Sequence, residues 1–118
     1  MITREQVLSY VQQQYGVIPD YPWEKYPNYV ALRHQKNGKW FVLIMDITAD
    51  KLGIDSDKVI DVVNVKVEKE FIGSLRQKQG VYEAYHMNKA NWVTLYLEEL
   101  RSIDELIEFI EASYQLTK

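Results

Sequence analysis

Two β-prone runs on either side of an Asn-Gly pair constrain this 118-residue chain more than any other feature. Residues 29–35 and 39–47 both carry strand-like patterns of apolar, β-branched and aromatic side chains. Asn37 and Gly38 lie between them, and both residue types tolerate the positive φ angles that two-residue hairpin turns require. The pattern therefore predicts a β-hairpin with a two-residue turn at Asn37-Gly38, and with it an antiparallel sheet.

A capping pattern and an apolar stripe predict a first helix over residues 4–15. Thr3 is a favourable N-cap, and Gln6 completes a capping box that satisfies two backbone N–H groups. Apolar side chains recur at helical spacing through the segment, and Gly16 suits the position just after a helix. Both ends of this helix are therefore marked in the sequence.

A second capping pattern predicts a last helix over residues 103–116, with Ser102 as the N-cap and Glu105 closing the box. Acidic residues in its first turn complement the helix dipole. A shorter apolar pattern predicts a middle helix over residues 68–78, which stops before Gly80. We thus expect helices near both ends of the chain and one between them.

Three further runs predict strands, at residues 59–67, 80–85 and 92–97. The last two are joined by residues 86–91, which are too many for a tight turn. The predicted order is α-β-β-β-α-β-β-α. Hairpin-linked strands with helices set apart from them indicate an α+β two-layer sandwich, in which helices pack on one face of an antiparallel sheet. At this length we expect a single domain spanning residues 1–118.

The residue inventory excludes several kinds of site. The chain has no cysteine, which excludes disulfides and thiolate metal centres. Its five glycines form no phosphate-binding loop, and its two histidines lie outside any metal-binding motif. No apolar run is long enough for a membrane span, and the N-terminus lacks the features of a signal peptide. We therefore expect a cytoplasmic protein with no membrane partner, no metal and no cofactor.

Charge is unevenly distributed along the chain, whose net charge is −3 at neutral pH. Residues 98–118 hold six carboxylates and two cations, a net charge of −4. Residues 22–45 hold four cations and one carboxylate, a net charge of +3. These segments either form solvated faces or, if the acidic last helix faces elsewhere, leave a basic patch able to bind a polyanion.

Aromatic residues form the first group that could carry binding chemistry. The chain has nine Tyr and three Trp, and several of them gather with all three prolines in residues 19–29. Such a segment either forms a rigid loop that covers one end of a sheet or offers rings that stack on bases and sugars.

His86 is the centre of the second group. Tyr85, Asn88 and Lys89 lie beside it, so a titratable ring, a phenol, an amide and a cation occur together. Three interpretations are open: a binding site for a ligand or partner, a connection held by side-chain hydrogen bonds, or the acid–base residue of an enzyme. No nucleophile or orienting carboxylate is visible beside His86, which disfavours the third.

The string Tyr85-His86-Met87-Asn88-Lys89, followed by Trp92 and Thr94, resembles the MmcQ/YjbR-like family of small bacterial proteins. Further points of similarity run through nearly the whole chain in the same order: Pro22-Trp23, Gly38-Lys39-Trp40-Phe41, Asn64-Val65-Lys66 and Ser113-Tyr114. Where family members have an acidic residue and a proline after the strand lysine, this chain has Val67-Glu68-Lys69.

The resemblance implies a frataxin-like (CyaY-like) α+β fold, a "double wing" motif and a non-enzymatic DNA-binding role. The hairpin tip would form one wing and the connection around His86 the other. The residues implied in nucleic-acid or ligand binding are Arg33, Lys36, Asn37, Lys39, Tyr85, His86, Asn88, Lys89, Asn91 and Trp92. The cations among them would contact phosphates, and His86, Asn88 and Asn91 would bond to bases or sugars.

Such DNA binding would be weak and salt-dependent, because four cation–phosphate contacts imply a salt slope of about −3 to −4 on duplex DNA. The alternative function is a small-ligand or protein-interaction module centred on residues 85–92, together with Trp23 and Tyr26. We expect a monomer or a weak homodimer in either case. The resemblance to the frataxin fold also suggests iron binding, which in frataxins uses an acidic ridge on and after the first helix. Here the first helix has Glu5 as its only carboxylate, which disfavours iron binding.

Overall fold

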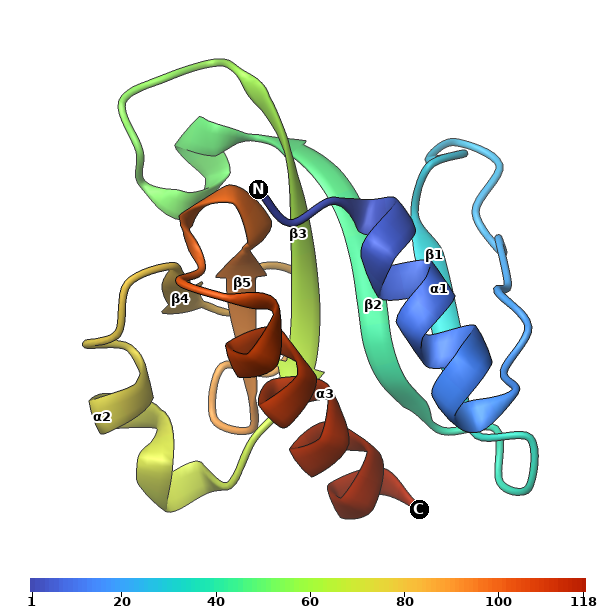
Figure 1. Ribbon diagram of the computed structural model, residues 1–118. Helices are drawn as coiled ribbons and strands as arrows, with labels where there is room; N and C mark the ends of the chain where they lie inside the picture. The colour runs from blue at the N-terminus through green and yellow to red at the C-terminus, as the bar shows by residue number, and fades with distance from the viewer.

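The computed structural model describes residues 1–118 as one antiparallel sheet of five strands, with two long helices on one of its faces (Figure 1). The helices are α1 Arg4–Tyr15, α2 Ile72–Leu75 and α3 Ile103–Thr117, and the strands are β1 Val30–Arg33, β2 Trp40–Thr48, β3 Val59–Lys66, β4 Val81–Glu83 and β5 Trp92–Tyr96. Short 3₁₀ turns occupy Ala49–Leu52, Lys69–Phe71 and Leu97–Glu99. The predicted α+β class and the predicted order of elements are confirmed.

The strand order is β1-β2-β3-β5-β4. Val42 near the start of β2 pairs with Val65 near the end of β3, which pairs in turn with Val93 near the start of β5. The loop at residues 34–39, before β2, and the connection at residues 84–91, before β5, therefore leave the sheet at the same end. They lie on either side of β3.

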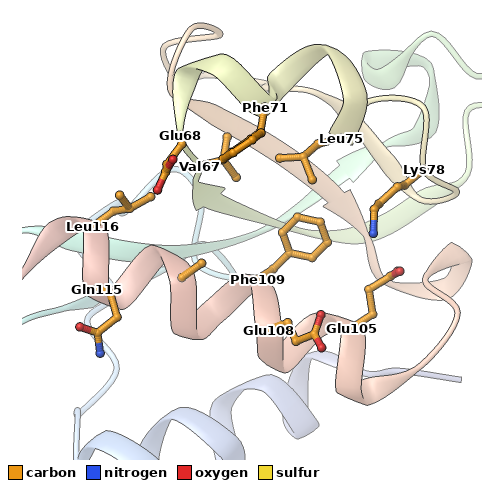
Figure 2. A pocket seen from close by; sticks show the side chains of 11 residues that line it. Val67, Glu68, Phe71, Leu75, Lys78, Glu105, Glu108, Phe109, Gln115 and Leu116 are labelled. Atoms are coloured by element: carbon orange, nitrogen blue, oxygen red, sulfur yellow. The ribbon is translucent and has the colours of Figure 1, made fainter.

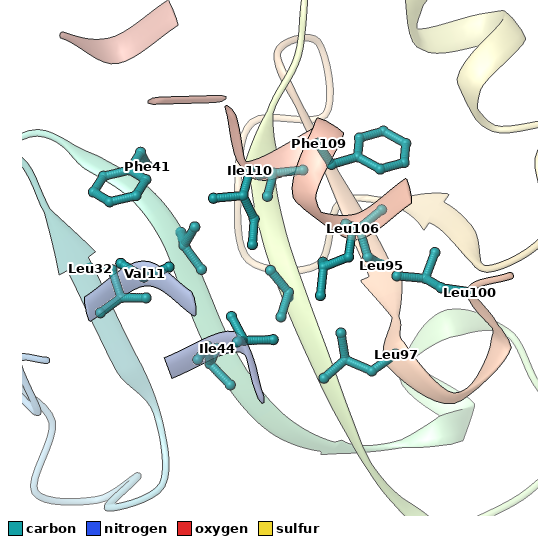
Figure 3. Packing of buried hydrophobic residues seen from close by; sticks show 14 of the residues in the cluster. Val11, Leu32, Phe41, Ile44, Leu95, Leu97, Leu100, Leu106, Phe109 and Ile110 are labelled. Carbon is teal, nitrogen blue, oxygen red and sulfur yellow. The ribbon is translucent and has the colours of Figure 1, made fainter. Parts of the chain in front are cut away.

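The main core lies between the sheet and the helices (Figure 3). Val7 and Val11 of α1 and Leu106 and Ile110 of α3 are fully or almost fully buried there. They pack against alternate residues of the strands, such as Val63 of β3, because successive side chains point to opposite faces of a sheet. The apolar stripes of both helices are thus buried on a single face.

The opposite face of the sheet carries no helix, and we call it the helix-free face. Its buried residues are Tyr29, Leu43, Met45, Ile47, Ala49, Ile60, Val62 and Tyr96. Loops cover them instead: Trp23, Ile54 and Met87 come from three different connections and pack against this cluster. Both faces of the central strands are therefore apolar and covered, but only one of them by helices.

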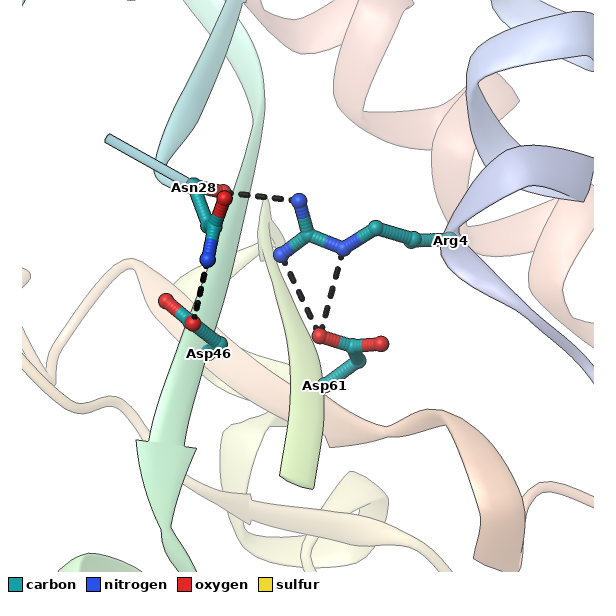
Figure 4. Close-up of polar contacts among 4 residues, drawn as sticks. All are labelled: Arg4, Asn28, Asp46 and Asp61. Carbon is teal, nitrogen blue, oxygen red and sulfur yellow. Dashed lines mark hydrogen bonds and ion pairs between the residues drawn. The ribbon is translucent and has the colours of Figure 1, made fainter. Parts of the chain in front are cut away.

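Arg4 fastens one of these covering loops to the rest of the fold (Figure 4). Its guanidinium donates to the Asn28 carbonyl at 2.8 Å and to Oδ1 of Asp61 at 3.2 Å. The Asn28 side chain donates in turn to Asp46 Oδ2 at 3.0 Å. Helix α1, strands β2 and β3, and the chain just before β1 are thereby linked by one polar network.

The hairpin forms, but the prediction of a two-residue turn is wrong. His34 N–H donates to the Lys39 carbonyl at 2.9 Å, so four residues lie in the loop, and Gly38 alone among them has a positive φ, 72°. The cause is the Asn37 side chain, which accepts from Lys39 N–H at 2.8 Å and donates to the Thr117 carbonyl at 3.0 Å. These bonds tie the hairpin tip to the end of α3.

The predicted helix over residues 68–78 is also wrong in length. The segment holds a 3₁₀ turn at Lys69–Phe71 and a single α-helical turn at Ile72–Leu75. Gly73 lies inside that turn and costs about 1 kcal/mol relative to Ala, and Phe71 is 51% exposed. With little apolar surface buried, nothing offsets the cost of extending so short a helix.

Candidate functional site

A hollow lined mainly by aromatic side chains lies on the helix-free face. Its volume is about 280 Å³, and we call it the aromatic hollow. It is lined by Trp23, Tyr26, Tyr29, Trp40, Leu43, Met45, His86 and Met87. These residues come from the segment before β1, from β2 and from the connection between β4 and β5. The two groups singled out in the sequence, the aromatic segment and the His86 cluster, therefore meet at one place.

Ring–ring contacts hold the walls of the aromatic hollow. Trp23 lies edge-on to Trp40 with ring centroids 5.4 Å apart, and edge-on to Tyr29 at 6.2 Å. Tyr26 stacks on Tyr29 at 4.6 Å and is still 48% exposed. Burial raises the pKa of the Tyr29 phenol, with a smaller effect from Tyr85, so this ring stays neutral. The hollow therefore offers neutral π-faces to a ligand.

A buried polar ring positions the connection that closes the hollow. Asn64 and Thr94 are fully buried on neighbouring strands. The Thr94 hydroxyl donates to Asn64 Oδ1 and accepts from Tyr85 N–H at 2.9 Å. Asn64 Nδ2 donates to the Tyr85 carbonyl at 2.8 Å. Both backbone groups of Tyr85 are thus fixed, which sets the direction in which the chain enters His86.

His86 is the one non-glycine residue at positive φ, 65°. That conformation costs a residue with a side chain roughly 1–2 kcal/mol. The imidazole is exposed and its centre lies 4.1 Å from that of the Tyr85 ring. Backbone strain of this kind gathers at sites where a side chain must be aimed in a particular direction. Here it brings the imidazole to the rim of the aromatic hollow.

The other residues of the connection mostly hold the connection itself. Asn88 Oδ1 accepts from Ala90 N–H at 2.8 Å, and the Asn91 carbonyl accepts from Val67 N–H at 2.8 Å. Trp92 begins β5, half-buried, and pairs with Lys66 of β3. The connection is therefore folded back and internally bonded.

Lys89 lies away from the aromatic hollow. Its Nζ donates to the Ala84 carbonyl at 2.7 Å. It also lines a separate polar hollow of about 330 Å³ together with Lys51, Arg76 and Tyr85. Tyr85 lines this polar hollow and the next residue, His86, lines the aromatic one.

The predicted residues of the hairpin fall into two sets. Arg33 is ion-paired with Asp20, and Asn37 bonds to α3, so both are engaged within the fold. Lys36 and Lys39 are exposed, and neither side chain makes a hydrogen bond or an ion pair. These two lysines remain available for a ligand.

Several lining residues were not among the predicted site residues, notably Trp40, Leu43 and Met45. One signal for them exists in the sequence: every residue from Trp40 to Met45 is apolar, so both faces of that strand must be covered. Which loop supplies the cover depends on tertiary contacts that the pattern does not encode. Lys51 and Lys89 line the same polar hollow although more than thirty positions separate them, and this pairing too depends on tertiary contacts.

No group of three or more metal-ligating side chains gathers anywhere in the structure. None of the helices has the length and hydropathy needed to cross a membrane.

The five-stranded antiparallel sheet, with helices on one face and a loop-built hollow on the other, defines a small α+β two-layer protein. The YjbR family model matches residues 12–116, and the chain belongs to the YjbR family, which confirms the resemblance. An uncharacterised protein of Bacillus subtilis, YyaQ, is 44% identical to it over 118 residues, all of both chains.

Solved structures share the fold. A crystal structure of a Pseudomonas syringae protein has a TM-score of 0.97 at 48% sequence identity, covering 99% of this chain and 100% of that one. A Deinococcus radiodurans protein has a TM-score of 0.73 at 22% identity, covering 98% of this chain and 78% of that one. The second likeness extends the fold to a distant sequence.

Proposed function

We propose that this chain is a non-enzymatic DNA-binding protein that holds an unpaired base in the aromatic hollow. The observation that carries the proposal is a set of open aromatic rings with cations on two sides. Lys39 directly precedes Trp40 of the hollow, and the exposed Lys51 lines the polar hollow, where Lys89 is bonded to the Ala84 carbonyl and Glu83 pairs with Arg76. Rings that stack on bases beside cations that follow the phosphates are the usual means of binding single strands.

A single strand fits this arrangement better than a duplex. The hollow is walled by Trp23, Tyr26 and Trp40, and base faces, which these rings would contact, are free only when a base is unstacked. Duplex binding relies chiefly on neutralising phosphates, whereas this chain has a net charge of −3. Stacking is worth about 1–3 kcal/mol per base and is less dependent on net charge.

The environment of His86 supports a binding role over an enzymatic one. An acid–base histidine is normally oriented by a hydrogen bond that its ring N–H donates to a carboxylate or a backbone carbonyl. The His86 ring instead lies against the Tyr85 ring and the apolar lining of the hollow, and no side chain hydrogen-bonds to it. As part of a binding site it would add a third ring and a donor at the rim.

A second candidate is a small-ligand module at the same place. The aromatic hollow has about the volume at which pockets for small molecules begin, and its lining is almost wholly apolar. A free planar compound such as a nucleoside could fill it without any contact to Lys36 or Lys39. The two candidates therefore differ in their dependence on those lysines.

The test is fluorescence anisotropy with a labelled twelve-nucleotide thymidine strand, titrated at several salt concentrations. Tyr26→Ala removes an exposed wall of the hollow, and we expect affinity to fall roughly 5- to 150-fold, the value of one stacked base. Lys36→Ala with Lys39→Ala should flatten the salt slope by about 1.4, since each phosphate contact on a single strand contributes about 0.7.

Lys69→Ala with Arg101→Ala is the matched control. It removes two exposed cations elsewhere on the surface, so its net charge equals that of the double variant at the hairpin. It should leave the salt slope close to that of the unaltered protein. The DNA-binding proposal would be refuted if the protein did not bind the strand at tens of micromolar in low salt. It would also be refuted if the hairpin variant and its control changed the affinity and the salt slope equally. Binding of free thymidine that depends on Tyr26 but not on the lysines would establish the small-ligand candidate instead.

A further inference from the structure

A third hollow, which shares no lining residue with the first two, lies between α2 and α3 (Figure 2). Its volume is about 400 Å³, and we call it the α2–α3 groove. Its apolar lining consists of Val67, Phe71, Leu75, Phe109, Ala112 and Leu116, and its polar lining consists of Glu68, Lys78, Glu105, Glu108 and Gln115. None of these residues takes part in the proposed DNA site.

The apolar lining is exposed because α2 is too short to cover it. Phe71, just before the single turn of α2, is 51% exposed, and Leu116 near the end of α3 is 38% exposed. Contiguous apolar surface of this kind on a small protein usually marks an interaction site. The α3 residues Phe109, Ala112 and Leu116 are spaced three and four apart, so they form one ridge along the helix. A second helix laid beside α3 would pack on that ridge.

The charges around the groove are mostly negative. Three carboxylates, Glu68, Glu105 and Glu108, face one cation, Lys78. Figure 2 shows Glu68 beside Leu116 at one end of the groove and Glu105 with Lys78 at the other. Lys78 makes no ion pair. A rim of this sign repels nucleic acid and attracts a cationic partner.

Glu105 has an unsatisfied carboxylate at the Lys78 end of the groove. The Ser102 hydroxyl accepts from its backbone N–H at 3.2 Å, but its side chain makes no return bond to Ser102, so the predicted capping box of α3 is only half formed. Glu105 Oε1 is shielded from solvent and has no hydrogen-bond partner. A carboxylate oxygen without a partner costs free energy, and that cost falls if the side chain turns to meet a donor bound in the groove. An ammonium or guanidinium group placed at this end of the groove would supply that donor.

We propose that the α2–α3 groove is a docking site for a basic amphipathic helix of a partner protein. The apolar face of that helix packs on the ridge of Phe109, Ala112 and Leu116 and on Phe71. Its lysine or arginine side chains pair with the carboxylates of the rim, one of them with Glu105. Helix-in-groove recognition uses this combination of apolar anchors at helical spacing and flanking charges.

The probe is a fourteen-residue peptide of leucine and lysine with leucines at helical i, i+3, i+4 and i+7 positions, and the matched peptide has glutamate in place of lysine. Isothermal titration calorimetry measures the affinity of each peptide for the chain, and amide chemical-shift mapping locates where each one binds. The lysine peptide should bind with shifts confined to α2, α3 and the residues between β3 and α2. The glutamate peptide should not bind.

Two variants of the chain locate the contact. Phe71→Ser, at an exposed position, and Glu105→Gln should each weaken binding of the lysine peptide at least about 5-fold. Ile18→Ser is the matched control, because Ile18 is 77% exposed and lies outside the groove, and it should have no effect. Unchanged circular dichroism and melting temperature show that each variant is folded.

Equal binding of both peptides, shifts spread outside the groove, or no binding by the lysine peptide would overturn the proposal. So would concentration-dependent self-association that Phe71→Ser abolishes, because the occupant would then be a second copy of this chain. Loss of DNA binding in Tyr26→Ala leaves this proposal untouched, since that residue lies in the other hollow.

Discussion

His86 shows at the level of one residue how stability and a binding geometry can conflict. Its φ of 65° is unfavourable for any residue with a Cβ and easy for glycine. His86→Gly and His86→Ala differ only in that Cβ, so we predict that His86→Gly is about 1 kcal/mol more stable in urea unfolding. Both variants lose the imidazole and should bind the thymidine strand less well. A glycine variant less stable than the alanine variant would show that the backbone here is unstrained.

His34, the other histidine, is buried and hydrogen-bonds to Thr117 Oγ1 at 2.7 Å. Burial lowers its pKa below the ordinary value of 6.5, although a backbone hydrogen bond to Tyr114 opposes the shift, and the charges of Lys118 and Lys39 add to it. As pH falls through about 6.5 the unfolded chain therefore takes up the proton before the folded one. The free energy of unfolding should be at its full value above that pH and decrease below it.

Urea unfolding at about pH 7.5 and about pH 5.5 measures this loss. The Glu111 carboxylate, whose pKa is lowered from 4.5 chiefly by the Tyr15 hydroxyl hydrogen bond, titrates below that window. His34→Gln should remove most of the difference between the two pH values, and His86→Ala should retain it. Equal stability of the unaltered protein at both values would contradict the assignment to His34.

At the scale of elements, the connection between β4 and β5 depends on the sheet beneath it. The Thr94 hydroxyl bonds to Asn64 Oδ1 and to Tyr85 N–H, so Thr94→Val keeps the shape of the side chain and leaves these two atoms without a partner. We predict a loss of about 1–3 kcal/mol in the free energy of unfolding. Thr48→Val is the matched control, because Thr48 ends β2 without a side-chain hydrogen bond, and it should stay within about 0.5 kcal/mol. Similar losses in both variants would mean that the buried ring is not what holds the connection.

The elements that the sequence predicted well are those whose signals are local. The signals for α1 are the capping box of Thr3 and Gln6 and the glycine at position 16, all inside the helix or next to it, and its bounds are those predicted. The hairpin turn differed because Asn37 bonds to Thr117, eighty positions away. The middle helix differed because its length depends on how much of Phe71 is buried, which is a tertiary property.

At the scale of the whole molecule, the local parts of the candidate site could be predicted from the sequence, and the way in which tertiary contacts bring them together could not. The aromatic segment and the His86 cluster were each visible as local groupings. Their convergence over β2 results from the register of β2, β3 and β5, which brings the connection before β5 beside the middle of the sheet. Arg33 and Lys89 looked available in the sequence because their partners, Asp20 and the Ala84 carbonyl, are not evident there.

We expect the ligand to bind on the helix-free face of the sheet and not on the face that carries the helices. Amide chemical-shift mapping of the ¹⁵N-labelled chain during titration with the thymidine strand tests this expectation most directly. The shifts should be concentrated at residues 23–29, 39–45 and 85–87, with the indole signals of Trp23 and Trp40 among the largest. Shifts concentrated instead on α1 and α3, or a spectrum that does not change at saturating strand in low salt, would contradict it.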